Sequence, residues 1–219
     1  MAAQTGTAAE LIPDGATLDV LRREAADCKA CELWTRATQT VFGEGAKAAA
    51  VMLIGEQPGD AEDRAGKPFV GPAGKLLDRA LAEAGIDRKQ AYVTNAVKHF
   101  NWSETRGKKR IHKKPNARQM AACKPWLEAE IHLLRPRVIV LLGATAAQQL
   151  LGPGFSVMKE HGRLIKSELA PSVVATVHPS SILRAPDDQS REAAMREFVE
   201  DLRKVAPLLQ ETPVTSRPS

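Results

Sequence analysis

The sequence predicts an α/β fold, a three-layer α/β/α sandwich around a mostly parallel sheet of roughly four strands. Short apolar runs rich in β-branched residues occur at 51–54, 92–94, 138–142 and 173–177, and each precedes a helical pattern. Continuous apolar strands of this kind are typical of parallel sheets that are buried on both faces. The helices between them would form the two covering layers.

The helical segments carry signals for their ends. The segment 73–85 is amphipathic and ends at Gly85, a residue typical of helix termini. Its apolar face contains Leu76, Leu77, Ala80, Leu81 and Ala84. Asn116 and Gln119 have the spacing of an N-cap and its N3 partner. Pro125 is expected to kink that helix or to begin a new one.

The chain of 219 residues is expected to form one domain over residues 17–205, long enough to bury a substantial core. Its last helix, at about 190–205, would direct its apolar side chains inward, namely Met195, Phe198, Val199 and Leu202. Residues 1–16 and 206–219 are expected to be flexible tails.

Composition argues against a membrane protein and against a disulfide-stabilised one. The apolar runs are far shorter than the roughly 20 residues of a membrane span, and the first residues lack a basic segment followed by an apolar stretch. Three cysteines, an odd number, do not form a disulfide framework. We therefore expect a cytoplasmic protein without a membrane partner.

The positive charge is concentrated in one segment. The chain has 31 lysines and arginines against 26 acidic residues, and seven of the basic residues lie within 106–118. The rest of the chain therefore has a slight excess of acids. A local basic patch on a nearly neutral body is typical of phosphate binding, although charge runs are as often solvated loops.

Polar and glycine-rich residues follow all four strands. They are "GEQPGD" at 55–60, Asn95, Gly143 and "HPSS" at 178–181. Ligands of such sheets bind beyond the carboxyl ends of the strands, so the sequence predicts a ligand site at this edge. An asparagine or histidine at a strand end is also typical of a turn or of a structural contact.

The three cysteines and one histidine suggest a metal site. Cys28 and Cys31 have metal-ligand spacing, Cys123 is the third thiol, and His99 follows the second strand. Three thiolates and an imidazole could hold zinc or an iron–sulfur cluster, and spacing alone does not distinguish the two. Buried cysteines without a metal are the alternative.

Five segments together resemble the uracil-DNA glycosylase superfamily. In order they are "GEQPGD", "GKPFVGPAGKLLD", "VTNAVKHF", "KKRIHK" and "VATVHPSSILR". More narrowly, they are similar to the X-type branch (UdgX), which is related to the family-four iron–sulfur glycosylases. The resemblance extends from about Leu18 to Val205. It implies an enzyme that removes uracil from DNA, the base-excision step of DNA repair.

The resemblance implies a [4Fe–4S] cluster, with zinc as the less favoured metal. The cluster ligands would be Cys28, Cys31, His99 and Cys123. Family-four proteins have a cysteine at the position of His99, whereas the X-type branch has the "KHF" that is found here.

The resemblance also implies a pocket for a uracil that has left the base stack. Asn95 would accept a hydrogen bond from uracil N3–H and donate one to O4, an arrangement that cytosine does not match. Phe69 would stack on the base. Gln57 is expected to contact the base or to replace the hydrolytic water, and Gln57 or Asp60 to exclude the methyl group of thymine.

Cleavage of the glycosidic bond places negative charge on the leaving uracil, and His178 would donate a hydrogen bond to its O2. Ile182 or Leu183 would fill the space that the base has left. The expected phosphate contacts are Ser180, Ser181, Arg184, Lys108, Lys109, Arg110 and Lys113.

In the X-type branch the histidine of "KRRIHK" attacks the sugar in place of water, and the corresponding segment here is "KKRIHK". His112 would thus be the nucleophile, kept uncharged by the surrounding cations. Glu56 would accept the other ring proton and fix the tautomer. Lys109 stands where the branch has arginine, which keeps the charge but loses a planar fork.

Three hypotheses remain. The favoured one is a monomeric glycosylase that cross-links itself to the abasic site of single-stranded DNA, acts once, and is associated with the nucleoid when bound. The second is a glycosylase of the family-four kind that uses water and turns over. The third is a non-catalytic, cluster-bearing protein that binds single-stranded DNA.

Overall fold

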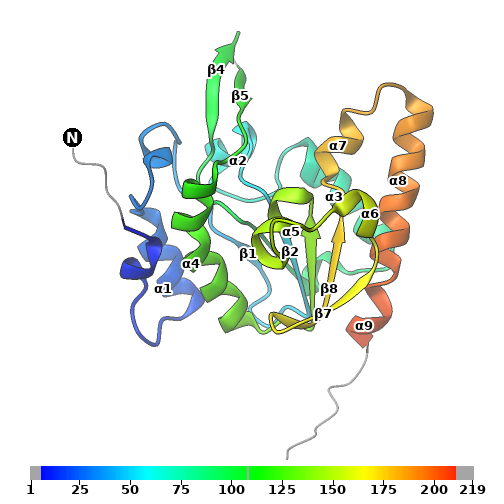
Figure 1. The fold of residues 1–219 in the computed structure, drawn as a ribbon, viewed down its shortest axis with the longest axis horizontal. Coiled ribbons are helices and arrows are strands. Elements are labelled where there is room, and N and C mark those ends of the chain that lie inside the picture. The colour runs from blue at the N-terminus through cyan, green and yellow to red at the C-terminus, as the bar shows by residue number, and fades with distance from the viewer. Residues whose placement is uncertain (1–5, 108, 211–219) are drawn as a thin grey trace, which may run out of the picture.

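The structure is a computed structural model that describes residues 6–107 and 109–210. Its centre is a six-stranded sheet in the order β1-β3-β2-β6-β8-β7, and β4 and β5 form a separate hairpin (Figure 1). The strands are β1 (Glu44–Gly45), β2 (Val51–Gly55), β3 (Ala91–Asn95), β4 (Trp102–Arg106), β5 (Lys109–His112), β6 (Val138–Leu142), β7 (Leu164–Ser167) and β8 (Ala170–Thr176).

The four expected strands form the parallel middle of the sheet. β2 pairs with β3 on one side and with β6 on the other, and β6 pairs with β8. The sheet has two further strands at its edges, β1 and β7, which pair antiparallel with their neighbours. Both edge strands are partly exposed, so they lack the continuous apolar run that marks the inner strands. The predicted α/β/α sandwich is confirmed, with six strands instead of four.

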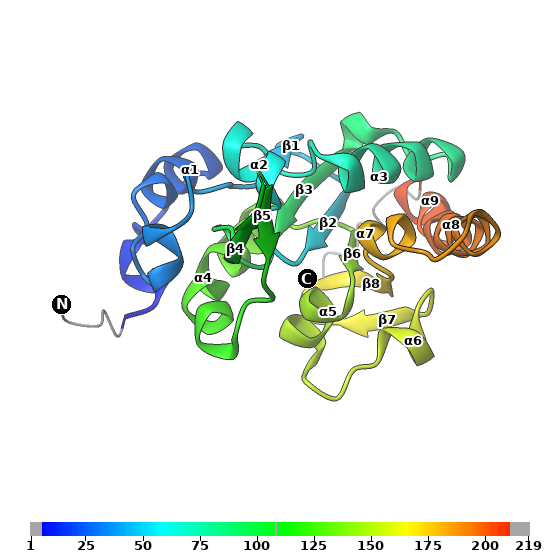
Figure 2. The same cartoon turned by 90° about the horizontal axis from the view of Figure 1, so that it is seen from above.

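Helices cover both faces of the sheet. The α-helices and 3-10 turns of the described chain are η1 (Ala8–Leu11), α1 (Leu18–Ala26), η2 (Glu32–Thr35), α2 (Asp60–Ala65), α3 (Pro72–Glu83), η3 (Arg88–Gln90), α4 (Ala117–Leu134), α5 (Ala144–Leu151), α6 (Val157–Glu160), α7 (Pro179–Leu183), α8 (Asp188–Arg203) and α9 (Ala206–Gln210). Figure 2 shows α3 and α8 on one side of the sheet and α4 and α5 on the other.

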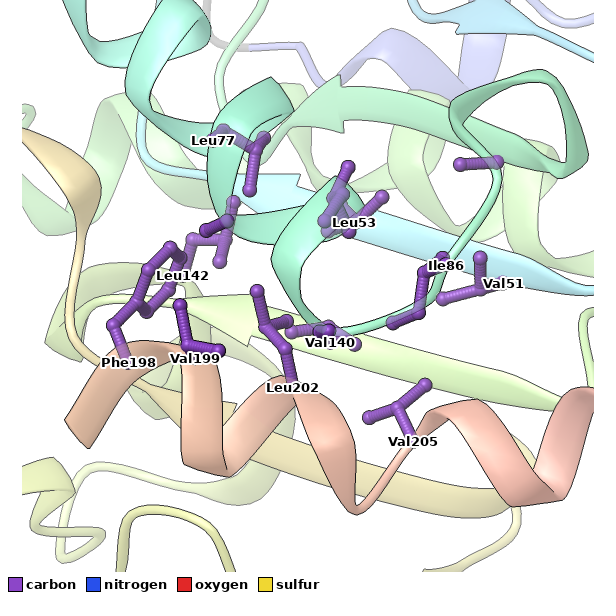
Figure 3. Close-up of a cluster of buried hydrophobic side chains, with 14 of the residues drawn as sticks. Val51, Leu53, Leu77, Ile86, Val140, Leu142, Phe198, Val199, Leu202 and Val205 are labelled. Atoms are coloured by element: carbon purple, nitrogen blue, oxygen red, sulfur yellow. The ribbon is translucent and has the colours of Figure 1, made fainter. Parts of the chain in front are cut away.

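The core is divided by the alternation of side chains along each strand. In β2, Val51 and Leu53 pack with α3 and α8, whereas Met52 and Ile54 pack with α4 and α5. Figure 3 shows the first of these clusters, in which the buried side chains of α8 lie against β6. Helices therefore cover both faces of the sheet, and a site can form at the ends of its strands.

The basic segment 106–118 includes part of a β-hairpin and is not one solvated loop. β4 and β5 pair antiparallel, with Trp102 opposite His112 and Arg106 opposite Lys109. Gly107 has a φ of 61°, which a glycine adopts without strain. In Figure 1 the hairpin projects from the body of the molecule on the same side as α7.

The predicted start of α4 is confirmed. The Gln119 backbone N–H donates to Asn116 Oδ1 at 2.9 Å, and the Asn116 backbone N–H donates to Gln119 Oε1 at 2.9 Å. Pro125 lies inside α4, which continues to Leu134, so no new helix begins at the proline.

Parts of both segments that were expected to be tails pack against the rest of the domain. Ala8 of η1 is fully buried in a cluster with Trp126 of α4. At the other end, Leu209 of α9 is buried, and its carbonyl accepts a hydrogen bond from Arg137. The remaining parts of the two tails, 1–5 and 211–219, lie outside the described residues. In the part of the chain that is described, no helix has the length and apolar character needed to cross a membrane.

Candidate active site

The carboxyl ends of the four parallel strands meet at one edge, as the sequence predicts. β2 ends at Gly55, directly opposite Asn95 at the end of β3. β6 ends at Leu142, directly opposite Thr176 at the end of β8. The loops that follow these strands are thereby brought together.

Asn95 and Phe69 both lie against the end of β2. A Cβ atom on Gly55 would collide with Asn95 Oδ1 and with the Phe69 ring, so the glycine is what allows both side chains to approach. Asn95 is 2% exposed. Among the described residues none hydrogen-bonds to its side-chain amide, which is therefore available to a ligand.

Phe69 is held in an unusual backbone conformation, with a φ of 56° that non-glycine residues rarely adopt. Gly74 in α3 makes room for it, because a Cβ atom there would collide with the Phe69 carbonyl. The Phe69 ring lies 6.2 Å from the ring of His178, measured between centroids. The Phe69 ring therefore lies near both of the predicted polar side chains, Asn95 and His178.

His178 is the N-cap of α7. Its Nδ1 accepts the backbone N–H of Ser180 at 3.1 Å, and the Ser180 hydroxyl lies 2.8 Å from the same nitrogen. With Nδ1 as an acceptor, the neutral ring carries its proton on Nε2. Burial lowers the pKa of His178 to about 4, and the positive charge of Arg184, with that of His112 when it is protonated, adds to this effect. The ring is therefore neutral near pH 7, with Nε2–H as its free donor.

His112, at the end of β5, lies beside Glu56 in the loop after β2. His112 Nε2 is 3.3 Å from Glu56 Oε1, and Glu56 Oε2 accepts a hydrogen bond from the Thr145 hydroxyl of α5. The imidazole also lies 6.1 Å from the buried ring of Phe100, between centroids. Its side chain is 48% exposed, so a large substrate can reach it. The hairpin thus carries His112 to the predicted edge.

The pKa of His112 is lowered, but the cause differs from the one expected. Partial burial of the ring lowers its pKa, Glu56 opposes this effect, and Arg184 adds to it. From the sequence, the lysines and arginines around His112 in the basic segment were expected to lower its pKa. Arg184 belongs instead to the end of α7, so the cation that matters comes from a distant part of the chain.

Gln57 holds the two ends of the hairpin. Its amide nitrogen donates to the carbonyls of Asn101 at 3.2 Å and of Lys113 at 3.1 Å, and its carbonyl accepts the Asn101 backbone N–H at 3.2 Å. Asn101 precedes β4 and Lys113 follows β5. The uracil contact expected of Gln57 stays a prediction, whereas the hydrogen bonds make it a brace for the strand that bears His112.

Arg110 is engaged inside the protein. Its guanidinium pairs with Asp60 and, at 2.7 Å, with the fully buried carboxylate of Asp63, and its side chain is 9% exposed. Asp60 also pairs with Arg64 at 3.1 Å. Burial disfavours the charged form of Asp60, but the bonds to the two arginines outweigh it and lower the Asp60 pKa. Arg110 and Asp60 thus join β5 to α2, a different role from the DNA and uracil contacts expected of them.

The other predicted DNA contacts surround the edge. Lys113 and Arg184 are exposed. The hydroxyls of Ser180 and Ser181 bond to the ring nitrogen and to the backbone carbonyl of His178, respectively. Lys109 is part of β5, and Lys108 lies outside the described residues.

Two residues, Ile182 and Leu183, were considered for filling the space that the base leaves, and one of the two is exposed. Ile182 is 1% exposed and belongs to the core. Leu183 is 39% exposed on α7, so its insertion into DNA stays a prediction.

Two buried carboxylates of α2 were not among the predicted site residues. Glu62 accepts the backbone N–H of Gly59 at 3.1 Å and that of Gly71 at 2.9 Å, which ties the loop after β2 to the start of α3. Asp63 accepts the Thr38 backbone N–H at 3.0 Å and pairs with Arg110. The acidic residues directly after "GEQPG" could have predicted a helix that begins there, because acidic side chains are favoured in the first turn of a helix.

The three cysteines lie around α4. Burial, opposed by Lys98 and helped by the charges of Cys31 and Cys28, raises the pKa of the Cys123 thiol to about 12. The Trp126 indole N–H donates to Cys28 Sγ at 3.3 Å, and the Lys98 backbone N–H donates to Cys123 Sγ at 3.2 Å. Hydrogen bonds of this kind to sulfur are found around iron–sulfur clusters.

His99 is buried near Thr40, with its Nε2 2.9 Å from the Thr40 hydroxyl. Burial lowers its pKa to about 4, so the ring is neutral, as a metal ligand must be. Over residues 6–107 and 109–210, no three His, Cys, Asp or Glu side chains are grouped so as to hold a metal ion. Three thiols, two of them with N–H donors on their sulfurs, and a neutral imidazole have the donor chemistry that an iron–sulfur cluster uses.

Comparisons with known proteins agree on one family. The family model described as the uracil DNA glycosylase superfamily matches residues 42–203. The chain is 34% identical over 182 residues to the type-4 uracil-DNA glycosylase of Thermotoga maritima, with 83% of this chain and 91% of that protein covered. It is 33% identical over 199 residues to the type-4 uracil-DNA glycosylase of Archaeoglobus fulgidus, with 88% and 93% covered. A type-5 uracil-DNA glycosylase of Pyrobaculum aerophilum is 29% identical over 169 residues, with 69% and 70% covered.

Proposed function

Because this chain belongs to the uracil-DNA glycosylase superfamily, we propose that it excises uracil from DNA and then becomes linked through His112 to C1′ of the abasic sugar. The type-4 relatives support the glycosylase activity. The observation that carries the covalent step is the position of His112 Nε2, 3.3 Å from Glu56 at the carboxyl edge of the sheet. It favours the X-type branch over the water-using type.

Two side chains, Asn95 and Phe69, would hold the extruded base. The Asn95 amide accepts from N3–H and donates to O4 of uracil, while cytosine would leave these buried groups unpaired. Phe69 stacks on the ring, since its own ring lies next to both Asn95 and His178. The closeness of these groups to Gly55 supports a small pocket that selects a pyrimidine.

The reaction moves one electron pair out of the glycosidic bond and another into a new bond. When the C1′–N1 bond breaks, its electrons remain on uracil, and His178 Nε2–H stabilises the charge at O2. The lone pair of His112 then attacks the positively charged C1′. With the Nε2 proton directed at Glu56, the lone pair is on Nδ1, and transfer of that proton to Glu56 leaves a neutral alkylated imidazole. No water is added, so the enzyme acts once.

Single-stranded DNA is the proposed substrate, because a base leaves an unpaired strand at lower cost than a duplex. The exposed Lys113 and Arg184 would bind phosphates on either side of the extruded nucleotide. We propose that the enzyme acts as a monomer. We place this reaction in the cytoplasm, at the nucleoid when DNA is bound.

A [4Fe–4S] cluster is part of the proposal, held by Cys28, Cys31 and Cys123, with His99 as the fourth ligand. When bound, the cluster would brace α1, η2, the loop after β3 and α4 against one another. The N–H donors of Trp126 and Lys98 would stabilise the two buried thiolates.

A turnover glycosylase that uses water is the second candidate, favoured by the identity to the type-4 relatives. One experiment separates the two. The protein is mixed with labelled single-stranded DNA containing one uracil, and both free uracil and a detergent-resistant retarded band are measured. Free uracil with the band supports the covalent mechanism, and free uracil without it supports turnover.

The controls identify the nucleophile. His112→Ala should abolish the band, whereas His132→Ala, an exposed histidine on α4, should leave it unchanged. A band that persists in His112→Ala would require another nucleophile. The absence of both uracil and band would favour the non-catalytic DNA-binding protein.

A further inference from the structure

A lysine is completely buried behind Asn95. Lys98 follows β3, and its side chain is 1% exposed, although lysines are almost never buried unless paired. Its Nζ donates to Glu130 Oε2 at 2.5 Å, to Thr94 Oγ1 at 2.7 Å and to the Asn95 backbone carbonyl at 2.7 Å. All three protons of the ammonium group thus have a partner.

Glu130, in α4, is equally well bonded. Besides Lys98, its carboxylate accepts from the Tyr92 hydroxyl at 2.8 Å, from the Thr94 hydroxyl at 3.0 Å and from the Gly43 backbone N–H at 3.1 Å. A buried ion pair is weak evidence for stability, because desolvation offsets much of its attraction. A fully bonded polar network does fix the geometry of the groups that it touches.

The group fixed by Lys98 is the backbone of Asn95. The residues after Asn95 are tied to the loop after β2, since the Ala96 N–H donates to the Gly55 carbonyl at 2.9 Å and the Val97 N–H to the Glu56 carbonyl at 3.0 Å. The Asn95 carbonyl is held from the other direction by Lys98. Rotation of this peptide would swing the Asn95 side chain away from Gly55.

We propose that Lys98 is a positioning residue for uracil recognition, which holds Asn95 so that its amide faces the base in one orientation. The inference rests on the proposed function, in which Asn95 binds uracil. Lys98 also donates its backbone N–H to Cys123, which like Glu130 belongs to α4. The orientation of Asn95 is therefore set relative to α4 by the side chain and by the backbone of the same residue.

The test removes both charges of the pair together. Lys98→Met combined with Glu130→Gln leaves no buried charge unpaired and changes the side-chain volumes little. With protein in excess over single-stranded uracil DNA, the maximal rate of uracil release should fall about a hundredfold, as for a group misplaced by roughly 1 Å. The protein concentration that gives half of the maximal rate should change little.

A double-mutant cycle separates positioning from a general loss of structure. If Lys98 acts through Asn95, the paired change should have almost no further effect on the residual rate of Asn95→Ala. A purely structural effect would reduce that rate again. Tyr92→Phe is the matched control, because it removes a donor to Glu130 but leaves the Asn95 carbonyl contact in place. It should lower the melting temperature and keep the rate.

The inference is overturned if the folded Lys98→Met, Glu130→Gln variant releases uracil at the full maximal rate. It is also overturned if this paired change slows Asn95→Ala as much as it slows the unaltered protein. If the pair does not fold, Lys98→Gln with Glu130→Gln replaces it, since two amides can bond to each other. Failure of the unaltered protein to release uracil would overturn the proposed function and this inference together. If instead the paired variant and the unaltered protein release uracil at the same rate, only this inference is overturned.

Discussion

His112 Nε2 lies 3.3 Å from Glu56 Oε1, although one residue ends a hairpin strand and the other follows the central strand of the sheet. The second oxygen of Glu56 accepts a hydrogen bond from Thr145, which limits rotation of the carboxylate. The carboxylate is therefore held beside the imidazole, and in the tautomer that we propose the ring proton is on Nε2 and the lone pair is on Nδ1.

The first prediction concerns this pair. Glu56→Gln keeps the size of the side chain but removes the anion that accepts the ring proton. The rate of adduct formation on single-stranded uracil DNA should fall about a hundredfold, the lower range for loss of a general base. The rate is followed as the retarded band on a denaturing gel. Glu83→Gln, on the exposed end of α3, should change nothing, and an equal effect of both variants would contradict the role of Glu56.

The second prediction is the pH dependence of adduct formation. His112 must be uncharged to attack, and burial together with Arg184 places its pKa below the usual 6.5. His178, with a pKa of about 4, stays neutral over the same range. The rate should therefore be constant between about pH 7 and 8 and decline only on the acid side of about 6.5.

Arg184→Gln tests the cause of this pH dependence. Removing the cation takes away one of the effects that lower the pKa of His112, so the midpoint of the decline should move to higher pH. Rates are compared at saturating protein, because the variant also loses a phosphate contact. A midpoint that stays in place would show that Arg184 does not act on the imidazole.

The third prediction concerns Gln57, which bonds to both ends of the hairpin. Gln57→Ala removes these bonds but leaves Asn95, Phe69 and His178 in place. Adduct formation should slow by roughly tenfold or more, while uracil release should be less affected, because a misplaced group loses rate steeply. Equal losses in the two assays would instead favour a direct contact of Gln57 with uracil.

The fourth prediction concerns the metal. Protein purified without air should contain iron and absorb visible light, and Cys123→Ser should lose both together with part of its thermal stability. Trp126→Phe removes only the N–H donor to Cys28 and should retain the iron. A colourless, iron-free preparation of the unaltered protein would contradict the cluster.

The sequence predicted those parts of the fold that repeat a simple pattern. The four inner strands were found because each contains a short run of buried, mostly apolar residues, which follows from burial on both faces. β1 and β7 were missed because these edge strands are partly exposed and lack a continuous apolar run. The hairpin was missed because the charge of "RGKKR" concealed its turn, although Trp102, Thr105 and Ile111 around Gly107 are residues typical of strands.

Asn95, His112 and His178 lie at one edge of the sheet, but the sequence did not reveal which polar groups are already bonded within the protein. Arg110 and Lys113 are close together in one basic segment and look equivalent there. In the structure Arg110 is paired with two carboxylates of α2, whereas Lys113 is exposed. Ion pairs between distant segments depend on the tertiary fold, which no local pattern reports.

The last prediction uses this difference. Arg110→Met leaves the buried Asp63 without its cation, so the free energy of unfolding in urea should fall by about 3 kcal/mol. Lys113→Ala should change that free energy by no more than about 0.5 kcal/mol.

In DNA binding, Lys113→Ala should have a larger effect than Arg110→Met. Lys113→Ala should reduce the log–log salt slope of binding to a single strand by about 0.7, because one phosphate contact is lost. Arg110→Met should leave the slope unchanged, since its guanidinium is held by Asp60 and Asp63 and does not face solvent. Both quantities are measured on the same two variants, the slope by fluorescence anisotropy. A slope that falls for Arg110→Met with little loss of stability would mean that the arginine leaves its carboxylates to bind DNA.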